Sequence, residues 1–343
     1  MTLPLRYEGN HSSNLVCKLK KSLYGLKQSP RAWFESNDDH TLFFKHYSSG
    51  GLSVLLIYVD DIIITGNDDK EIQNLSNCLV QEFDVKTLGR LKYFLGIKVA
   101  HSSKDMFISQ RKYIIDLLAR TEKSVCKPAN TPIDPNQKLL FYLTHTQPDI
   151  SHAVSILSQF MYQPKEYHLH AAYRVLHYLK GTPGKGVLFN QNEKVEVEMF
   201  TDANYASSMI DRRSTSGHVT FFGSNLVTWR SKNKMALAQG ICELLWVKNL
   251  LDELQIPLFS PMKIYCDNKS AVNLMHNPVQ HDHTKHMEID RHFIKKKLEP
   301  NVICISYILI NNQLADILTK GISGTQRQKI ILKLGMDDIP SPA

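Results

Sequence analysis

Two adjacent aspartates interrupt a long apolar run in the stretch LLIYVDDIIITGND (residues 55–68). An unpaired buried carboxylate is costly, and a neighbouring negative charge adds to that cost. Asp60 and Asp61 must therefore stand in an exposed turn or beside a bound cation. The residues on both sides are β-branched, aromatic or otherwise apolar, so they predict two buried strands joined by a hairpin with the aspartates at its tip.

The hairpin tip decides what the two carboxylates can do. Neighbours on one straight strand point to opposite faces, whereas at a tip both side chains reach the same small volume. Mg²⁺ takes one or two carboxylates together with substrate phosphates and waters. The long apolar flanks favour such a metal site over a plain surface turn.

Further aspartates follow predicted strands in the C-terminal half. The alternating stretch VEVEMFTDANY predicts a strand that delivers Asp202, and MKIYCDNKSAVNLM predicts a strand that reaches Asp267 and turns into a helix capped by Asn268. HVTFFG and NLVTWRSK predict two more strands in an antiparallel meander, and residues 236–254 an amphipathic helix. VICISYILI then predicts a last strand, and QLADILTKGI a helix that carries Asp316.

Charge and cysteine usage narrow the class of protein. The 41 Lys and Arg against 33 Asp and Glu give a net charge of +8, which favours a polyanionic partner. No window approaches the apolar length of a membrane span, and no signal peptide opens the chain. The six cysteines are scattered without a Cys-x-x-Cys pair, which speaks against a zinc ribbon or a disulfide scaffold and suits a reducing compartment.

Many long motifs occur along the chain in a fixed order. They are KLKKSLYGLKQSPRAWFE, YVDD, LGRLKYFLGIKV, PDISHAVSILSQFM, AAYRVLHYLKGTPGKGVLF, FTDANYASSMIDRRSTSGHVTFFG, CDNKSAV, TKHMEIDRHFIKKKLE and QLADILTKGI. Together they resemble the C-terminal part of the Pol polyprotein of Ty1/copia-type retrotransposons. The resemblance covers nearly the whole chain and implies a reverse transcriptase followed by a ribonuclease H.

The resemblance implies an α/β (α+β) chain. We expect a truncated reverse-transcriptase palm, a helical connection, and a ribonuclease H-like mixed five-stranded sheet with helices. The expected segments are residues 1–125 for the palm, 126–192 for the linker and helical connection, 193–325 for the ribonuclease H-like domain, and 326–343 for a C-terminal tail. The middle stretch CKPANTPIDPNQK is rich in Pro and Asn, and it independently predicts an extended linker.

The resemblance also assigns roles to particular residues. It implies Mg²⁺, with Mn²⁺ as an alternative, bound by catalytic carboxylates in both domains. In two-metal hydrolysis one ion activates water and the other stabilises the departing 3′ oxygen. The expected catalytic and metal-binding residues are Asp60, Asp61, Asp202, Asp267 and Asp316. The expected nucleic-acid contacts are Lys27, Arg31, Arg212, Arg213, His286 and Arg291.

The sequence departs from the family pattern where two further carboxylates are expected. After WRSK, similar proteins have a serine-rich turn and a helix whose first turns supply a glutamate, and this chain runs WRSKNKMALAQGICE instead. Glu243 is the nearest carboxylate on that helix, but at 1.5 Å of rise per residue it stands roughly 15 Å from the required place. The chain also opens after the strand that would carry the first polymerase aspartate, so Met1 resembles an internal methionine of a longer reading frame. Residues 30–46 and 133–149 are shorter than their counterparts.

These departures set the functional expectation. The parent activities are RNA-directed DNA polymerisation from deoxynucleoside triphosphates and hydrolysis of RNA in RNA–DNA hybrids, and we expect both to be impaired or inactive in this copy. The alternatives are a non-enzymatic nucleic-acid-binding remnant and a pseudogene product without a role. Expected partners are RNA–DNA hybrid and template-primer, without a membrane and with the oligomeric state open. The expected location is intracellular, in a cytoplasmic particle or the nucleus.

Overall fold

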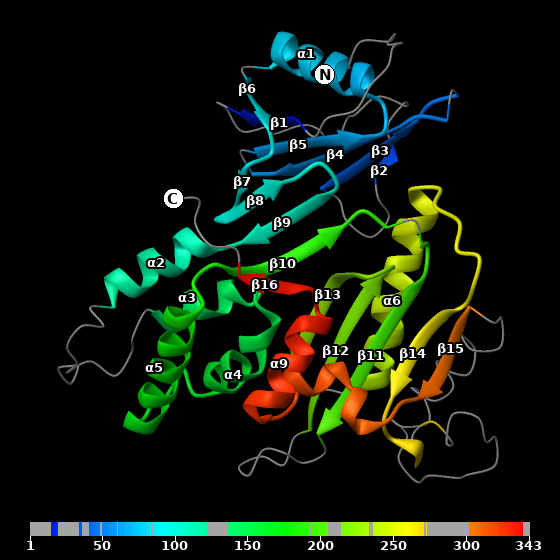
Figure 1. Cartoon of the computed structure of the whole chain (residues 1–343). Coiled ribbons are helices and arrows are strands. Elements are labelled where there is room, and N and C mark those ends of the chain that lie inside the picture. Colours follow the sequence, from blue (N-terminus) through cyan, green and yellow to red (C-terminus); the bar gives the residue numbers. More distant parts are fainter. Residues whose placement is uncertain are drawn as a thin grey trace. The chain divides into compact units, whose positions relative to one another are not determined.

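The structure is a computed structural model that describes about 70% of the chain (Figure 1). The described residues are 15–19, 34–35, 41–48, 50–59, 61–83, 85–121, 136–192, 194–204, 214–232, 236–270, 272 and 302–338. Contacts group the chain into two compact units, one of Met1–Phe94 with Trp246–Pro257 and one of Leu95–Leu245 with Leu258–Ala343. Within the described ranges, no helix combines the length and the apolar character that a membrane span requires.

The first unit contains a six-stranded sheet in the order β2-β3-β4-β5-β1-β6. Strands β4 and β5 are antiparallel, with Tyr58 opposite Asp61, which confirms the predicted hairpin. Helix α1 packs against the sheet and buries Ile72 and Leu79 in the same cluster as Ile62 and Ile64 of β5. The elements are β1 (Leu15–Leu19), β2 (Phe34–Glu35), β3 (Leu42–His46), β4 (Leu52–Tyr58), β5 (Asp61–Gly66), α1 (Asp69–Glu82), β6 (Val85–Arg90) and β7 (Tyr93–Phe94).

The second unit contains strands of the second sheet, which pair although they are far apart in the sequence. β8 (Ile97–His101) and β9 (Asp105–Ser109) form a hairpin, β9 pairs with β10 (Lys185–Asn190), and β10 pairs with β16 (Met336–Asp338). The N-terminal segment of the first unit ends at Phe94, whereas the palm segment expected from the sequence runs to residue 125. The division into palm, connection, nuclease and tail stays a prediction.

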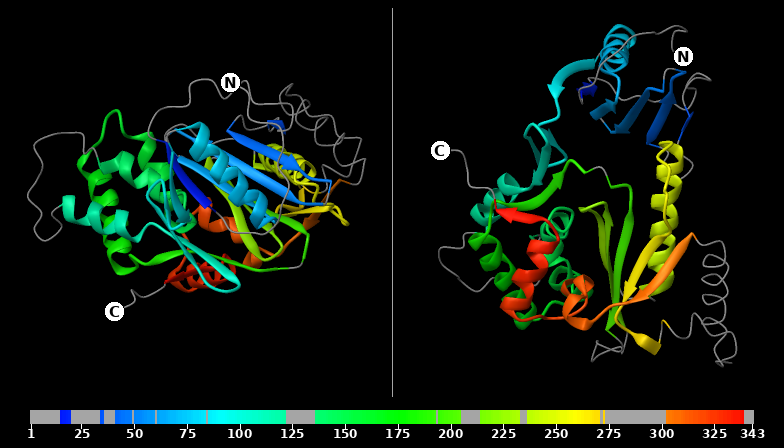
Figure 2. Two further views of the ribbon diagram at one scale, coloured as in Figure 1. Left: turned by 90° about the horizontal axis from the view of Figure 1, so that it is seen from above. Right: turned by 45° about the vertical axis from the view of Figure 1, so that its right-hand side comes forward.

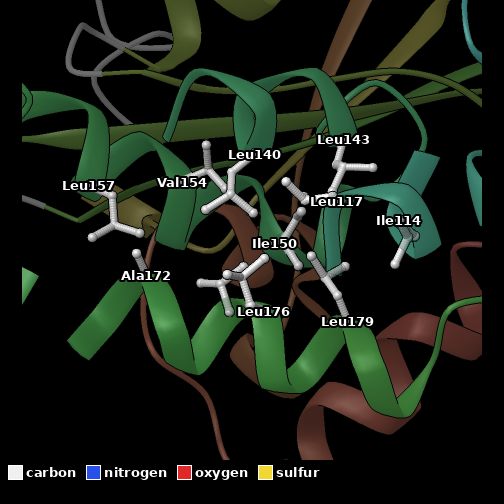
Figure 3. Close-up of a cluster of buried hydrophobic side chains, with 11 residues drawn as sticks. Ile114, Leu117, Leu140, Leu143, Ile150, Val154, Leu157, Ala172, Leu176 and Leu179 are labelled. Carbon is white, nitrogen blue, oxygen red and sulfur yellow. The ribbon is translucent and has the colours of Figure 1, made fainter. Parts of the chain in front are cut away.

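Helices occupy the described residues between β9 and β10. Residues 126–135 of the predicted extended linker lie outside the described residues, and its last three residues, 136–138, belong to a helix. They are α2 (Arg111–Arg120), α3 (Asn136–Leu143), α4 (Pro148–Gln159) and α5 (Glu166–Gly181). Proline stands in the first turn of α4, where its missing N–H has no helical partner to lose. Ile114, Leu143, Ile150 and Leu179 bring all four helices into one buried cluster (Figure 3).

The third sheet has the order β13-β12-β11-β14-β15. β11, β12 and β13 form an antiparallel meander, while β14 runs parallel to β11 and β15 parallel to β14, so the expected mixed five-stranded sheet is confirmed. Its elements are β11 (Val197–Asn204), β12 (Thr215–Phe222), β13 (Asn225–Lys232), α6 (Ala236–Glu253), β14 (Met262–Cys266), β15 (Ile303–Tyr307), the 3₁₀ helices η2 (Ile310–Asn312) and η3 (Leu314–Leu318), and α9 (Gly324–Lys333).

Helices cover both faces of this sheet (Figure 2). On one face α6 approaches β11 so closely that a Cβ on Gly240 would lie 2.8 Å from the sulfur of Met199. On the other face η3 and α9 pack on the strands, and Leu318 and Ile331 share a cluster with Val219. Most of α9 and all of β16 lie in the segment expected to be a C-terminal tail, and Ile330, Ile331 and Met336 of these elements belong to this core.

A buried polar network joins the connection helices to α9. The Asp149 carboxylate of α4 accepts a hydrogen bond from the Tyr178 hydroxyl of α5. Lys185 Nζ and Arg327 Nη2 each lie 3.7 Å from Asp149 Oδ2, and Arg327 Nη2 also donates to the Asp149 carbonyl at 2.9 Å. Removing one partner from a buried network of this kind leaves an uncompensated charge, so these elements depend on one another.

Candidate functional site

Three aspartates from separate elements meet beside the C-terminal ends of β11 and β14 in the third sheet. Asp202 lies near the end of β11, Asp267 directly follows β14, and Asp316 lies in η3. One carboxylate oxygen from each of the three lies within 4.8 Å of the other two. This is the set of C-terminal aspartates expected from the sequence, and the fold brings all three together.

The register of two parallel strands explains the first pair. Thr201 of β11 pairs with Cys266 of β14, so the next residue of each chain segment, Asp202 and Asp267, emerges at the same level. Parallel strands end at the same edge of a sheet. Two residues 65 positions apart in the sequence thereby become neighbours.

A glycine on β12 lets the third aspartate approach. Gly217 is opposite Asp202, and a Cβ there would lie 2.6 Å from Leu318 Cβ and 3.0 Å from Thr319 Cγ2. Glycine at this position allows η3 to lie directly on the strand. The Thr319 hydroxyl donates a hydrogen bond to Asp202 Oδ2 and links η3 to β11.

Asp316 lies in a short 3₁₀ helix rather than in the α-helix expected for QLADILTKGI. The Gln313 side chain caps this helix by accepting from the Ala315 N–H, and the Thr319 N–H donates back to the Asp316 carbonyl three residues earlier. The tighter turn ends after five residues, and α9 starts separately at Gly324.

Neutral side chains hold the carboxylates in place. Gln313 Nε2 donates to the Thr201 carbonyl at 3.0 Å and to Asp267 Oδ1 at 3.4 Å. Gln326 Nε2 of α9 donates to Asp316 Oδ2 at 3.3 Å. These amides fix the orientation of two carboxylates without adding charge.

One lysine lies inside the group. Lys320 Nζ is 2.8 Å from Asp316 Oδ1 and 3.7 Å from Asp202 Oδ2. Burial by itself would lower the pKa of Lys320, but the contact with Asp316 and the charges of Asp202 and Asp267 raise it overall. The lysine therefore stays protonated at neutral pH.

The pKa of Asp316, whose side chain is 1% exposed, is also raised, but here burial is the main cause. Burial raises the pKa of Asp316 to about 6, although Lys320 lowers it, and the charges of Asp202 and Asp267 raise it further. A carboxylate that loses solvation and faces like charges resists ionisation unless a cation compensates it.

The donor set fits a divalent cation. Carboxylate oxygens are the ligands that hard divalent cations prefer, and here three carboxylates face one ammonium group, which leaves net negative charge in a mostly buried volume. Asp202, Asp267 and Asp316 are the residues that would hold such an ion.

Glu243 takes no part in this cluster. His218 Nε2 lies 3.9 Å from Glu243 Oε2, and His218 pairs with Thr201 across the strands. Since neighbours on a strand point to opposite faces, and Gly217 faces η3, His218 and Glu243 lie on the face that α6 covers. The sheet itself separates Glu243 from the aspartates.

The hairpin of the first unit is only partly described. Asp61 starts β5, is half-buried, and pairs with both Tyr58 and Lys18, whereas Asp60 lies outside the described residues. Val59, next to the aspartates, has a φ of 49° and is 73% exposed, a strained backbone conformation for a β-branched residue. Among the residues that the structure describes, Asp61 is not part of a group of three candidate metal ligands.

The six nucleic-acid-binding candidates all lie outside the described residues, namely Lys27, Arg31, Arg212, Arg213, His286 and Arg291.

Sequence reasoning missed four residues of the cluster. Lys320 could have been found, because it follows Asp316 by four residues, the spacing at which helical side chains meet. Thr319 lies beside it. Gln313 and Gln326 carry no signal in the sequence, because their roles depend on how η3 and α9 pack on the sheet.

The mixed five-stranded sheet with its helices is the expected ribonuclease H-like fold, and it carries the aspartate cluster. Residues 1–135 match the family model described as "Reverse transcriptase (RNA-dependent DNA polymerase)". The chain is 38% identical over 384 residues to the "Retrovirus-related Pol polyprotein from transposon RE1" of Arabidopsis thaliana, covering 99% of this chain and 26% of that protein. The RE2 polyprotein of the same plant is 35% identical over 384 residues, with the same coverage of both chains. The chain belongs to the Pol polyprotein family of copia-type retrotransposons.

The matched relatives are longer than this chain. The chain spans about a quarter of the length of these curated relatives. The alignments extend over 384 residues while the chain has 343, so the relatives have at least 41 residues within the matched region that this chain lacks. Among solved structures, the foamy viral protease-reverse transcriptase in complex with RNA/DNA hybrid is similar, at 13% identity with a TM-score of 0.45, over 79% of this chain and 37% of that chain.

Proposed function

We propose that the aspartate cluster is a Mg²⁺ site, with Mn²⁺ as an alternative, and that it hydrolyses the RNA strand of RNA–DNA hybrids at an impaired rate. The observation that carries this proposal is the convergence of Asp202, Asp267 and Asp316 within 4.8 Å. A bound pair of divalent ions would supply an activated water and stabilise the departing 3′ oxygen.

The chain's own residues supply position and charge. Gln313 and Gln326 orient Asp267 and Asp316 through their amide hydrogen bonds, and Thr319 orients Asp202. The low exposure of Asp202 and Asp316 excludes most water from them, so these two carboxylates would act on a bound cation with little screening.

The impairment follows from the carboxylate that is missing. The family pattern has a fourth ligand at the start of the helix after WRSK, and here Glu243 lies on the opposite face of the sheet. Three carboxylates hold one ion well and a second ion poorly. The relatives have at least 41 residues within the matched region that this chain lacks, so we propose that DNA polymerisation from deoxynucleoside triphosphates is impaired or absent as well.

A hydrolysis assay tests the nuclease proposal. The full chain is incubated with a labelled RNA–DNA hybrid in Mg²⁺ and in Mn²⁺, beside Asp202→Asn and the matched control Asp252→Asn, which changes an exposed aspartate of α6. We expect slow cleavage that Asp202→Asn abolishes and Asp252→Asn preserves. Cleavage that survives Asp202→Asn would assign the activity elsewhere, and a folded wild-type chain without cleavage would reject turnover.

The second candidate function is binding of nucleic acid without turnover, which the net charge of +8 favours. Template-primer and RNA–DNA hybrid are the proposed partners, inside the cell in a particle or the nucleus. Phosphate neutralisation makes affinity fall steeply with salt. A hybrid-binding titration at several salt concentrations therefore tests it, and the absence of any salt-dependent binding would leave a product without a nucleic-acid role.

A further inference from the structure

A positive charge stands at the entrance of the aspartate cluster. The side chain of Lys320 is 29% exposed, against 1% for Asp316 and 8% for Asp202. The Lys320 side chain is therefore more accessible to solvent than either of these carboxylates. The Lys320 N–H donates to the Asp316 carbonyl at 3.1 Å, and this turn of backbone sets both side chains on one side.

The ammonium group uses the oxygens that a metal ion needs. Lys320 Nζ lies 2.8 Å from Asp316 Oδ1, a contact as short as a charged hydrogen bond, and 3.7 Å from Asp202 Oδ2. Both carboxylates belong to the group that can surround one ion. A divalent cation placed there would meet a positive charge a few ångströms away, and repulsion at that distance in a poorly solvated site is strong.

The other groups on the cluster do not compete in this way. Gln313, Thr319 and Gln326 are neutral donors, and their contacts leave the negative charge of the carboxylates unchanged. Among the described residues, Lys320 is thus the one cationic side chain that forms ion pairs with the cluster.

We infer that Lys320 is a built-in counter-cation that neutralises the cluster when no metal is bound and competes with divalent cations for Asp316 and Asp202. Metal binding displaces its ammonium group toward solvent, which its flexible four-carbon stem and partial exposure allow. The lysine stabilises the metal-free fold and weakens metal affinity. This inference rests on the proposed metal site.

Calorimetric titration of Mn²⁺ and of Mg²⁺ into the full chain tests it. Lys320→Met removes the charge and keeps most of the length of the side chain, and Lys320→Arg keeps the charge. Lys263→Met is the matched control, because Lys263 on β14 also pairs with two carboxylates, Glu196 and Glu198, at 3.6 and 3.5 Å. We expect Lys320→Met to bind Mn²⁺ roughly tenfold tighter than wild type or more, and the other two variants to stay within about twofold.

Thermal unfolding provides a second measurement that does not depend on calorimetric heat. In EDTA, Lys320→Met should unfold at a lower temperature than wild type, because three carboxylates then repel one another without a counter-ion. Adding Mn²⁺ should raise its unfolding temperature more than that of wild type or of Lys263→Met. A Lys320→Met chain that folds only when metal is present would also support the inference, because its stability would then depend entirely on the added cation.

The outcomes separate the inference from the proposed function. Unchanged or weaker Mn²⁺ binding by Lys320→Met, with wild type binding normally, overturns the counter-cation role and leaves the metal site standing. Failure of both wild type and Lys320→Met to bind overturns both proposals. Equal binding by wild type and Asp202→Asn would place the bound metal outside the cluster and reject both as well.

Discussion

The two aspartate-bearing regions of the chain are built in opposite ways. Asp60 and Asp61 are neighbours in the sequence, and a single hairpin of β4 and β5 delivers them. Asp202, Asp267 and Asp316 are 65 and 49 residues apart, and three elements of the third sheet region must assemble before the cluster exists. A local pattern therefore identifies the first region, whereas the second depends on strand register and helix packing.

The difference extends to the surroundings of the carboxylates. Asp61 is half-buried at a strained tip beside Val59, whereas Asp316 is almost completely buried and has a shifted pKa. A site built by one hairpin should tolerate substitutions elsewhere in the chain. A site assembled from several elements should also respond to substitutions at residues that do not contact a ligand.

The largest expected effect comes from a substitution that blocks assembly. Gly217→Ala places a Cβ 2.6 Å from Leu318 Cβ and should push η3, with Asp316, off the strand. Overpacking of this kind costs about 1–3 kcal/mol of folding free energy, and Mn²⁺ affinity should fall roughly tenfold or more. Chemical denaturation and calorimetry measure the two effects.

Gly324→Ala is the control for that experiment, since a Cβ there meets nothing within 4 Å. Its stability should stay within about 0.5 kcal/mol of wild type. Normal metal affinity in Gly217→Ala would show that the cluster does not need the close approach of η3.

The next effect is a pH dependence confined to the assembled site. The pKa of Asp316 is raised from 3.8 to about 6 in the folded chain, chiefly by burial. The folded state then binds a proton that the unfolded state has released, so stability from this group is present below about pH 4 and is lost as pH rises toward 6. Denaturant unfolding of the metal-free chain from pH 4 to 7 measures it.

Asp316→Asn isolates that contribution from those of other titrating groups. The variant should lose the decline between pH 4 and 6, whereas Asp252→Asn should keep it. Mn²⁺ should reverse the trend in wild type, because the cation binds the ionised carboxylate. An identical pH profile in wild type and Asp316→Asn would contradict the raised pKa.

The smallest expected effect belongs to the local site. Val59→Gly relieves a positive φ at the hairpin tip and should stabilise the chain by about 1 kcal/mol, or roughly 2–4 °C in thermal unfolding. The same change in an ordinary helical conformation, Val80→Gly in α1, should destabilise by about 0.5 kcal/mol. Destabilisation by both would mean that Val59 is not strained.

Particular elements show how far the sequence could predict the fold. The hairpin, the meander of β11 to β13 and the helices α4 and α5 follow apolar periodicity and end at local signals such as Gly181, so they were predictable. The pairing of β9 with β10 and of β10 with β16 was not, because it joins segments that are far apart in the chain. The contribution of α9 to the core was missed for the same reason.

By itself, the sequence determined the family, the order of the elements and the candidate metal-binding aspartates, because motifs and periodicity are properties of neighbouring residues. Only the tertiary structure decided that Asp202, Asp267 and Asp316 meet, that Glu243 lies on the other face, and that Lys320 stands among the carboxylates. Distance and burial set the strength of charge interactions, and both arise only when the strands and helices pack.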